Sequence, residues 1–148
     1  MISIQSVSHA YPGGVKISFK DWQINDGDQW LLLGASGSGK TTLLQILTGI
    51  LRPHEGKVKM GETLLYELSS AALDQFRGRN IGIIFQRPHL IKSLTIEENL
   101  LMAQSFAKLP EDKKRITEAL HSLGIADKSN NYPSELSQGQ LQRVSIAR

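Results

Sequence analysis

The N-terminal part of the chain alternates apolar and polar residues with the period of two that is typical of half-buried β-strands. Residues 2–7 follow this pattern, and residues 15–19 repeat it after the turn sequence Pro12-Gly13-Gly14. An apolar run ends at Leu33 and predicts a strand over residues 29–33 that leads into a glycine-rich loop. We therefore expect the first part of the chain to consist of short strands.

The middle of the chain predicts a mixture of strands and helices. The helix expected over residues 40–51 is apolar on nearly all sides, which implies burial between layers. Residues 57–60 and 63–65 have the pattern of a hairpin, and residues 69–77 that of a short helix. The apolar run over residues 81–85, rich in β-branched side chains, predicts a buried strand.

Beyond this run the periodicity changes to that of amphipathic helices. Thr95 and Glu98 have the spacing of a capping box at the start of a helix with one apolar face. Pro110 predicts the start of a second helix, and Ser137 with Gln140 repeats the capping-box spacing before a third. The C-terminal part is therefore expected to be helical.

The composition is that of a globular protein, with 40% hydrophobic and 21% charged residues among 148 and a net charge of +3. The adjacent basic residues Lys113-Lys114-Arg115 lie near three acidic residues, so we expect a solvated helix face and no nucleic-acid partner. The chain has no cysteine, which excludes disulfides and thiolate metal sites. No apolar run approaches a membrane span of about 18 residues, and no signal peptide is evident, so a cytoplasmic location is expected.

The glycine-rich segment after Leu33 carries the clearest chemical motif. It matches the spacing G-x-x-x-x-G-K-[ST] of a phosphate-binding loop that joins a strand to a helix. Glycines let such a loop bring N–H groups around a phosphate, its lysine reaches the β- and γ-phosphates, and its Ser or Thr hydroxyl holds Mg²⁺. The alternative is a Gly/Ser loop with a solvated lysine. The residues expected to bind the nucleotide are Gly34, Ala35, Ser36, Gly37, Ser38, Gly39, Lys40, Thr41 and Thr42, with Thr41 on the metal.

Three further motifs accompany this loop. Tyr11 lies upstream of it, and Gln86 follows the second apolar run. The segment Leu136-Ser137-Gln138-Gly139-Gln140 is followed by Gln-Arg-Val and Ile-Ala-Arg. In order and spacing, this combination resembles the nucleotide-binding subunits of ABC transporters, whose signature reads L-S-G-G-Q, with Gln138 here in place of the first glycine. The approach to Gln86 is most similar to exporters of the lipoprotein-release and macrolide type.

The resemblance implies an α/β fold: a RecA-like P-loop NTPase core with an N-terminal antiparallel β subdomain and an α-helical subdomain. Residues 1–88 would form the β subdomain and core, and residues 89–148 the helical subdomain. The family's strand ending in Asp-Glu, with the catalytic Glu, and a later histidine are expected beyond Arg148, so the chain would be truncated before that strand and have no catalytic residue. Its own histidines are expected on the surface; they are His9, His54, His89 and His121.

The resemblance also assigns roles to the three motifs. Tyr11 would stack on the adenine, and Gln86 would approach Mg²⁺ or the attacking water. Without the family pattern, Tyr11 could instead hold the following turn, and Gln86 could be a polar strand end. The signature residues would face the γ-phosphate of an ATP held by the opposite subunit, although locally they predict only a good helix start; they are Ser137, Gln138, Gly139 and Gln140.

Partners and function follow from the same resemblance. We expect Mg²⁺ and ATP as ligands, a second ATPase subunit, identical or different, and a membrane permease that docks near Arg87 to Leu94 and holds the protein at the inner face of the membrane. On sequence alone, that segment is an ordinary loop. The complete domain would couple ATP hydrolysis to transport, whereas the 148-residue chain would bind ATP without hydrolysing it. A non-hydrolysing nucleotide-binding module and a soluble ABC-type ATPase remain as alternatives.

Overall fold

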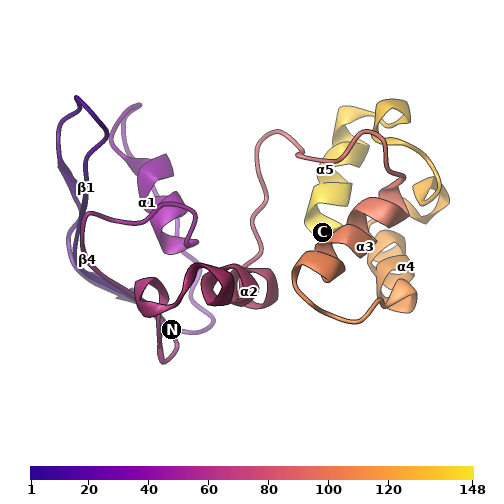
Figure 1. Cartoon of the computed structure of the whole chain (residues 1–148). Helices are drawn as coiled ribbons and strands as arrows, with labels where there is room; N and C mark the ends of the chain where they lie inside the picture. Colours follow the sequence, from indigo (N-terminus) through magenta and orange to yellow (C-terminus); the bar gives the residue numbers. More distant parts are fainter. The chain divides into compact units, whose positions relative to one another are not determined.

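The computed structural model describes all residues from Met1 to Arg148, and its main elements are labelled in Figure 1. The chain divides into two compact units, Met1–Leu73 and Asp74–Arg148, and helix α2 (Ser70–Asn80) spans the boundary. This helix continues through Gly78, where the sequence pattern predicted that it would end. The subdivision of the chain at residue 88 stays a prediction.

The first unit contains a five-stranded antiparallel sheet in which β1 pairs with three other strands. The order is β2-β1-β4-β5, and β3 pairs with the other end of β1. The predicted strands near the N-terminus and the predicted hairpin are confirmed, whereas β3 was not predicted. The strands are β1 (Ile2–His9), β2 (Ile17–Ser18), β3 (Trp22–Ile24), β4 (Glu55–Met60) and β5 (Thr63–Leu64).

A bulge in β1 brings the end of that strand close to the start of β4. The register of the pair shifts between Gln5 and Ser8, and Ser6 has a φ of 50°. Opposite the bulge, Gly56 has a φ of +89°, and a Cβ there would lie 2.5 Å from the carbonyl oxygen of Ser6. Only glycine fits this close approach of the two backbones. Beyond it, the amide of His54 donates to the carbonyl of Ser8 over 2.9 Å, which extends the pairing.

Helix α1 (Lys40–Leu47) lies beside the sheet in the first unit (Figure 1). Leu43 and Ile46 are buried, as are Val7 of β1 and Val58 of β4. Leu44, however, is 52% exposed. The prediction that this helix is buried on nearly all sides is therefore wrong, because α1 packs through one face only.

Two predicted strands are absent from the structure. Residues 29–33 and 81–85 pair with no strand, and Leu31 and Leu33 are 81% and 77% exposed. An apolar run forms a strand only where a neighbouring strand satisfies its backbone N–H and C=O groups. No such neighbour lies along either run, so the prediction of a strand at both places is wrong for this chain.

Three helices dominate the second unit: α3 (Ile96–Phe106), α4 (Lys113–Ser122) and α5 (Gln138–Ala147). The capping boxes predicted before α3 and α5 are both present. Helix α4 begins later than the predicted Pro110, because the Asp112 carboxylate caps it by accepting from the amide of Arg115 at 2.9 Å. The 3₁₀ turns η1 (Leu65–Glu67), η2 (Ala126–Lys128) and η3 (Pro133–Glu135) complete the secondary structure.

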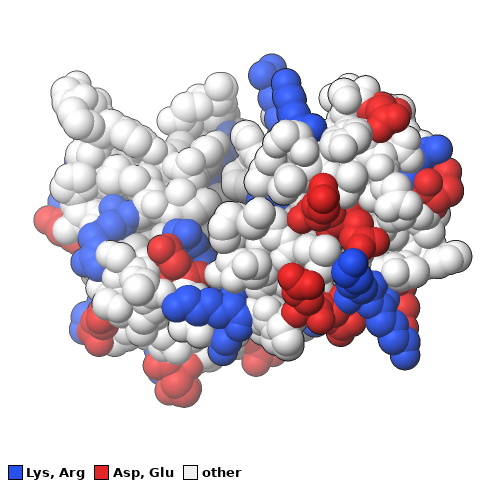
Figure 2. Space-filling model, turned by 45° about the vertical axis from the view of Figure 1, so that its right-hand side comes forward, with Lys and Arg blue, Asp and Glu red and all other residues white.

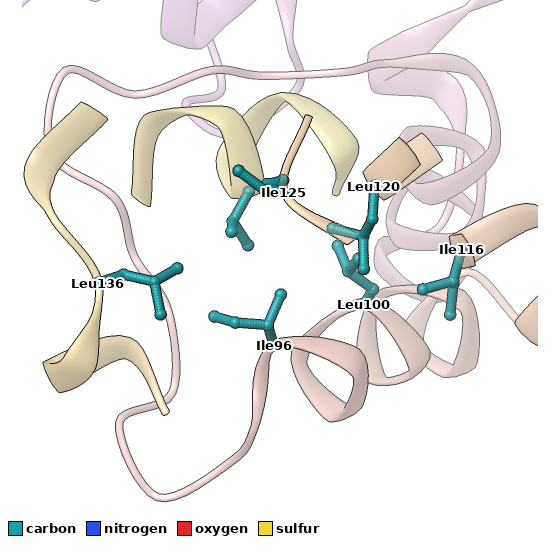
Figure 3. Packing of buried hydrophobic residues seen from close by; sticks show 7 residues of the cluster. Ile96, Leu100, Ile116, Leu120, Ile125 and Leu136 are labelled. Carbon is teal, nitrogen blue, oxygen red and sulfur yellow. The ribbon is translucent and has the colours of Figure 1, made fainter. Parts of the chain in front are cut away.

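The helices of the second unit enclose a continuous apolar core (Figure 3). Its residues come from all three helices and from the segments between α4 and α5, and each is at most 8% exposed. None of the helices in the chain combines the length and apolar character that a membrane span requires. The core residues are Ile96, Leu100, Ile116, Leu120, Ile125, Leu136 and Val144.

Candidate functional site

The glycine-rich loop before α1 contains two glycines in the left-handed backbone region. Gly37 and Gly39 have φ values of +78° and +88°, in the left-handed region that favours glycine. A Cβ on Gly39 would lie 3.0 Å from Cγ2 of Ile17, so a side chain at this position would crowd that residue of β2. Helix α1 begins at Lys40, as predicted, and no side chain caps its first turn. The first-turn N–H groups are therefore available to an anion.

The ammonium group of Lys40 is turned back over this loop. Its Nζ donates to the carbonyl oxygens of Gly34 and Ala35 over 2.8 Å and 2.6 Å. No acidic residue lies in the first turn of α1 to neutralise the positive charge. The lysine and the positive end of the helix dipole thus act on the same small volume, and both favour a polyanionic ligand.

The two threonines after Lys40 differ in their surroundings. The Thr42 side chain is buried, and its Oγ1 lies 3.1 Å from the phenolic oxygen of Tyr11. The Thr41 side chain is exposed, and its hydroxyl oxygen is a hard ligand of the kind that Mg²⁺ prefers. Thr41 therefore fits a metal-binding role, whereas Thr42 joins the predicted adenine-contacting tyrosine to the start of α1.

Tyr11 belongs to a small aromatic cluster at the end of β1. Its ring lies edge-on to the imidazole of His9, with 4.9 Å between the centroids, and is 45% exposed. His9 is buried, so the prediction that all four histidines lie on the surface is wrong for this residue. Because β1 pairs on both edges, its last residue is covered by the segments before β2 and β4.

In the second unit, Gln86 lies in an exposed segment that has no regular structure. The loop that follows is organised by Asn99, which the sequence pattern did not single out. The buried Asn99 amide accepts from the Ile91 N–H at 2.7 Å and donates to the carbonyls of Ile91, Leu94 and Thr95. A polar residue on the apolar face of an expected helix was the one available signal. Asn99 therefore links α3 to Ile91 and Leu94 of the predicted docking segment.

The signature segment begins α5. The Ser137 hydroxyl accepts from the Gln140 N–H at 3.3 Å, and the Gln140 side chain accepts from the Ser137 N–H at 2.9 Å. Gly139 is exposed, and a Cβ on it would have no atom within 4 Å. Within this chain, Ser137 and Gln140 act as a helix cap, and nothing in the chain requires glycine at position 139.

Charges of both signs are interspersed over the face shown in Figure 2. In the basic segment at the start of α4, Lys113 pairs with Glu97 at 3.1 Å, and Lys114 lies 3.9 Å from Glu118. These pairs are those of a solvated helix face. A hollow of about 720 Å³ in the second unit is lined by residues 81–85 and by residues of α2, α3 and α5, both apolar and polar.

The α/β fold with its phosphate loop is that of a P-loop NTPase. The family model described as "ABC transporter" matches residues 19–148, and the chain belongs to this family. Its likeness to a solved structure of the ATP-binding cassette MJ0796, described as a dimer in a post-hydrolysis state bound to ADP and Pi, has a TM-score of 0.88. The two sequences are 31% identical over 99% of this chain and 68% of that one.

Curated relatives include subunits of two kinds of transport system. The chain is 38% identical to the methionine import ATP-binding protein MetN of Carboxydothermus hydrogenoformans, over all of this chain and 45% of the relative. It is 40% identical to the lipoprotein-releasing system ATP-binding protein LolD 1 of Chlorobium luteolum, over 95% of this chain and 64% of the relative. The chain thus spans about half the length of MetN. Since an importer and a releasing system are both similar, the likeness does not select one direction of transport.

Proposed function

We propose that the chain is the nucleotide-binding part of an ABC transporter subunit that binds Mg-ATP at residues 34–42 and couples ATP hydrolysis to transport. The start of α1 carries the proposal, because left-handed Gly39, an uncapped first turn and the Lys40 ammonium converge on one loop. The names of MetN and LolD as ATP-binding proteins support the same function. So does the ADP in the MJ0796 cassette.

Each residue of the loop has a distinct task in this proposal. The N–H groups from Ala35 to Thr42 surround the phosphates, and Lys40 neutralises charge on the β- and γ-phosphoryl oxygens. The exposed Thr41 hydroxyl is suited to hold Mg²⁺, which would supply further charge neutralisation there when it is bound. From the family resemblance alone, Gln86 is proposed as a residue that approaches the metal or the attacking water. Tyr11 stacks on the adenine through the exposed part of its ring.

The signature residues 137–140 are proposed to act on the ATP of an opposite subunit. Glycine in a helix costs about 0.5–1 kcal/mol relative to alanine, and no intrachain contact explains Gly139. An approaching phosphate that needs the bare backbone would explain it. The dimeric state of MJ0796 supports such a pairing of subunits. The start of α5, including Gln138, is exposed and therefore accessible to a second subunit.

A permease is proposed to dock on residues 87–94. Asn99 of α3 holds this loop through hydrogen bonds to the backbone of Ile91, while the side chains of Ile91 and Lys92 remain exposed for contact. A preformed loop loses little conformational entropy when it binds, which favours a docking role. The subunit would then lie at the cytoplasmic face of the membrane, with its helical subdomain beginning near residue 89.

Replacing Lys40 with alanine tests the nucleotide site. We expect Lys40→Ala to weaken Mg-ATP binding by about 1.5–3 kcal/mol, the range for a hydrogen bond to a charged group. Isothermal titration calorimetry at fixed ionic strength measures this loss. The exposed Lys20 in the same unit provides the control, since Lys20→Ala removes the same charge outside residues 34–42. Equal ATP affinity in Lys40→Ala and Lys20→Ala would refute the site.

Replacing Ser137 tests the proposed dimer in the full-length protein. We expect Ser137→Arg to leave ATP binding by the monomer unchanged but to abolish ATP-induced dimerisation, because a bulky cation would stand in the path of the opposite phosphate. Light scattering with ATP under non-hydrolysing conditions measures dimerisation. If Ser137 is only a helix cap, replacing it costs about 1 kcal/mol of stability. Dimerisation of the variant at the wild-type level would then favour the cap alone.

A further inference from the structure

The end of β1 and the start of β4 bring two histidines together behind Tyr11. The Nδ1 atoms of His9 and His54 are 3.2 Å apart, and the two rings meet edge to face with centroids 4.7 Å apart. His9 is buried between His54 and Tyr11 and contacts both rings. His54 is exposed to solvent. The three rings therefore contact one another in the order His54, His9, Tyr11.

The hydrogen-bond partners assign the tautomers of the two histidines. The backbone N–H of Ala10 donates to Nδ1 of His54 over 3.4 Å, so this nitrogen carries a lone pair and no hydrogen. The hydrogen between the histidines consequently belongs to Nδ1 of His9. The single lone pair on Nδ1 of His54 thus accepts from both the Ala10 N–H and the His9 N–H. Sharing one lone pair weakens each bond, which agrees with their lengths of 3.4 Å and 3.2 Å. Ala10 directly precedes Tyr11, so this acceptor holds the backbone that carries the tyrosine.

Few charged groups surround the pair. From β4, Glu55 lies beside His54; from the segment before β2, Lys16 pairs with Glu55 at 2.6 Å; from β1, the Ser8 hydroxyl donates to Glu55 at 2.9 Å. Lys16 and Ser8 lower the pKa of the Glu55 carboxyl, and the charge of protonated His54 adds to the effect. Glu55 is therefore ionised across the neutral and mildly acidic range and can act as a counter-charge for His54.

We propose that His54 is a positioning residue for Tyr11, and that its protonation weakens the binding of adenine nucleotides. This inference rests on the proposed function, in which Tyr11 stacks on the base. A proton on Nδ1 of His54 removes the acceptor of the Ala10 N–H and directs an N–H at the hydrogen on His9. If the hydrogen of His9 moves to its other ring nitrogen, Nδ1 of His9 can accept from protonated His54. No tautomer of His9, however, restores an acceptor for the Ala10 N–H. The backbone before Tyr11 then loses its anchor, and the ring of His9 loses its fixed orientation.

Nucleotide binding at two pH values tests this positioning role. We expect the wild-type chain to bind ATP less tightly at about pH 5.5 than at about pH 8, because protonation of an imidazole nitrogen removes the lone pair that accepts a hydrogen bond. His54→Asn keeps an acceptor oxygen near the place of Nδ1 but cannot take up a proton. The wild type should lose at least about fivefold more affinity than His54→Asn, the lower end of the effect of a lost stacking contact. Because the wild type and His54→Asn are compared at the same pH, any effect of the protonation of ATP on its affinity is the same for both proteins.

Inorganic triphosphate separates the Tyr11 route from effects on the phosphate loop. It has no base, so its affinity should change equally with pH in the wild type and in His54→Asn. A variant in the second unit, His121→Asn, removes an exposed imidazole far along the sequence and should behave as the wild type. If the wild type and His54→Asn lose ATP affinity equally, or if triphosphate shows the same difference as ATP, the inference is wrong.

Nuclear magnetic resonance of the chain without nucleotide tests the same link independently. The Ala10 amide and the Tyr11 ring resonances should titrate together with the His54 imidazole, and should not do so in His54→Asn. If ATP fails to bind but these resonances titrate together, the proposed function is wrong while the positioning of Tyr11 by His54 stands. Resonances of Tyr11 that do not follow His54 would overturn the inference whatever the outcome with ATP.

Discussion

The helical region from Thr95 onward and the two apolar runs at residues 29–33 and 81–85 use their hydrophobic residues in opposite ways. In the helical region, the apolar face of each helix packs into one core. In the two runs, side chains of the same kind, such as Leu33 and Phe85, remain exposed. A helix satisfies its own backbone and needs only a surface to cover its apolar face, whereas a strand needs another strand beside it. Of these two regions, the apolar residues are buried only in the one where the backbone N–H and C=O groups form hydrogen bonds within the helices.

Truncating the core of the helical region should have the largest effect. Ile96 is fully buried among all three helices, so Ile96→Ala should lower the free energy of unfolding by about 2–5 kcal/mol through lost packing and a cavity. Urea denaturation followed by circular dichroism measures this change. A loss below about 0.5 kcal/mol, the size typical of surface substitutions, would show that this core is not closed in solution.

Removing the amide of Asn99 should have an intermediate effect. Asn99→Ala leaves the Ile91 N–H and the Leu94 carbonyl without this partner, while the carbonyls of Ile91 and Thr95 keep a backbone donor. The loss should destabilise the helical region by about 1–3 kcal/mol. Hydrogen exchange of the Ile91 amide, measured by NMR, should accelerate at the same time. Asn130→Ala, at an exposed position in the same unit, is the matched control. Unchanged exchange at Ile91 would mean that Asn99 does not hold this loop.

Truncating an exposed apolar run should have the smallest effect. Leu33→Ala removes a side chain that is 77% exposed and should change the free energy of unfolding by less than about 0.5 kcal/mol. The same urea experiment as for Ile96→Ala measures it. A loss of about 2 kcal/mol or more would mean that the run is buried, and would remove the contrast between the two regions.

Local signals account for most of what could be predicted. The phosphate loop, the start of α1 and the capping boxes at Thr95 and Ser137 involve residues only a few positions apart, so their chemistry is readable in the sequence. The family resemblance rests on these same segments, and the family assignment is confirmed. The nucleotide contacts of Tyr11, Gln86 and the signature remain predictions.

The sequence by itself determined the phosphate-loop motif and the starts of α3 and α5, because the interactions that specify them close within one helical turn. The class of fold followed from the family resemblance carried by the same motifs. Only the tertiary structure decided which apolar runs are buried and what surrounds Tyr11. Tyr11 meets Thr42 from 31 residues away, and His9 meets His54 from 45. Such pairs depend on how β1, β4 and α1 come together, and no periodicity or spacing in the chain encodes that arrangement locally.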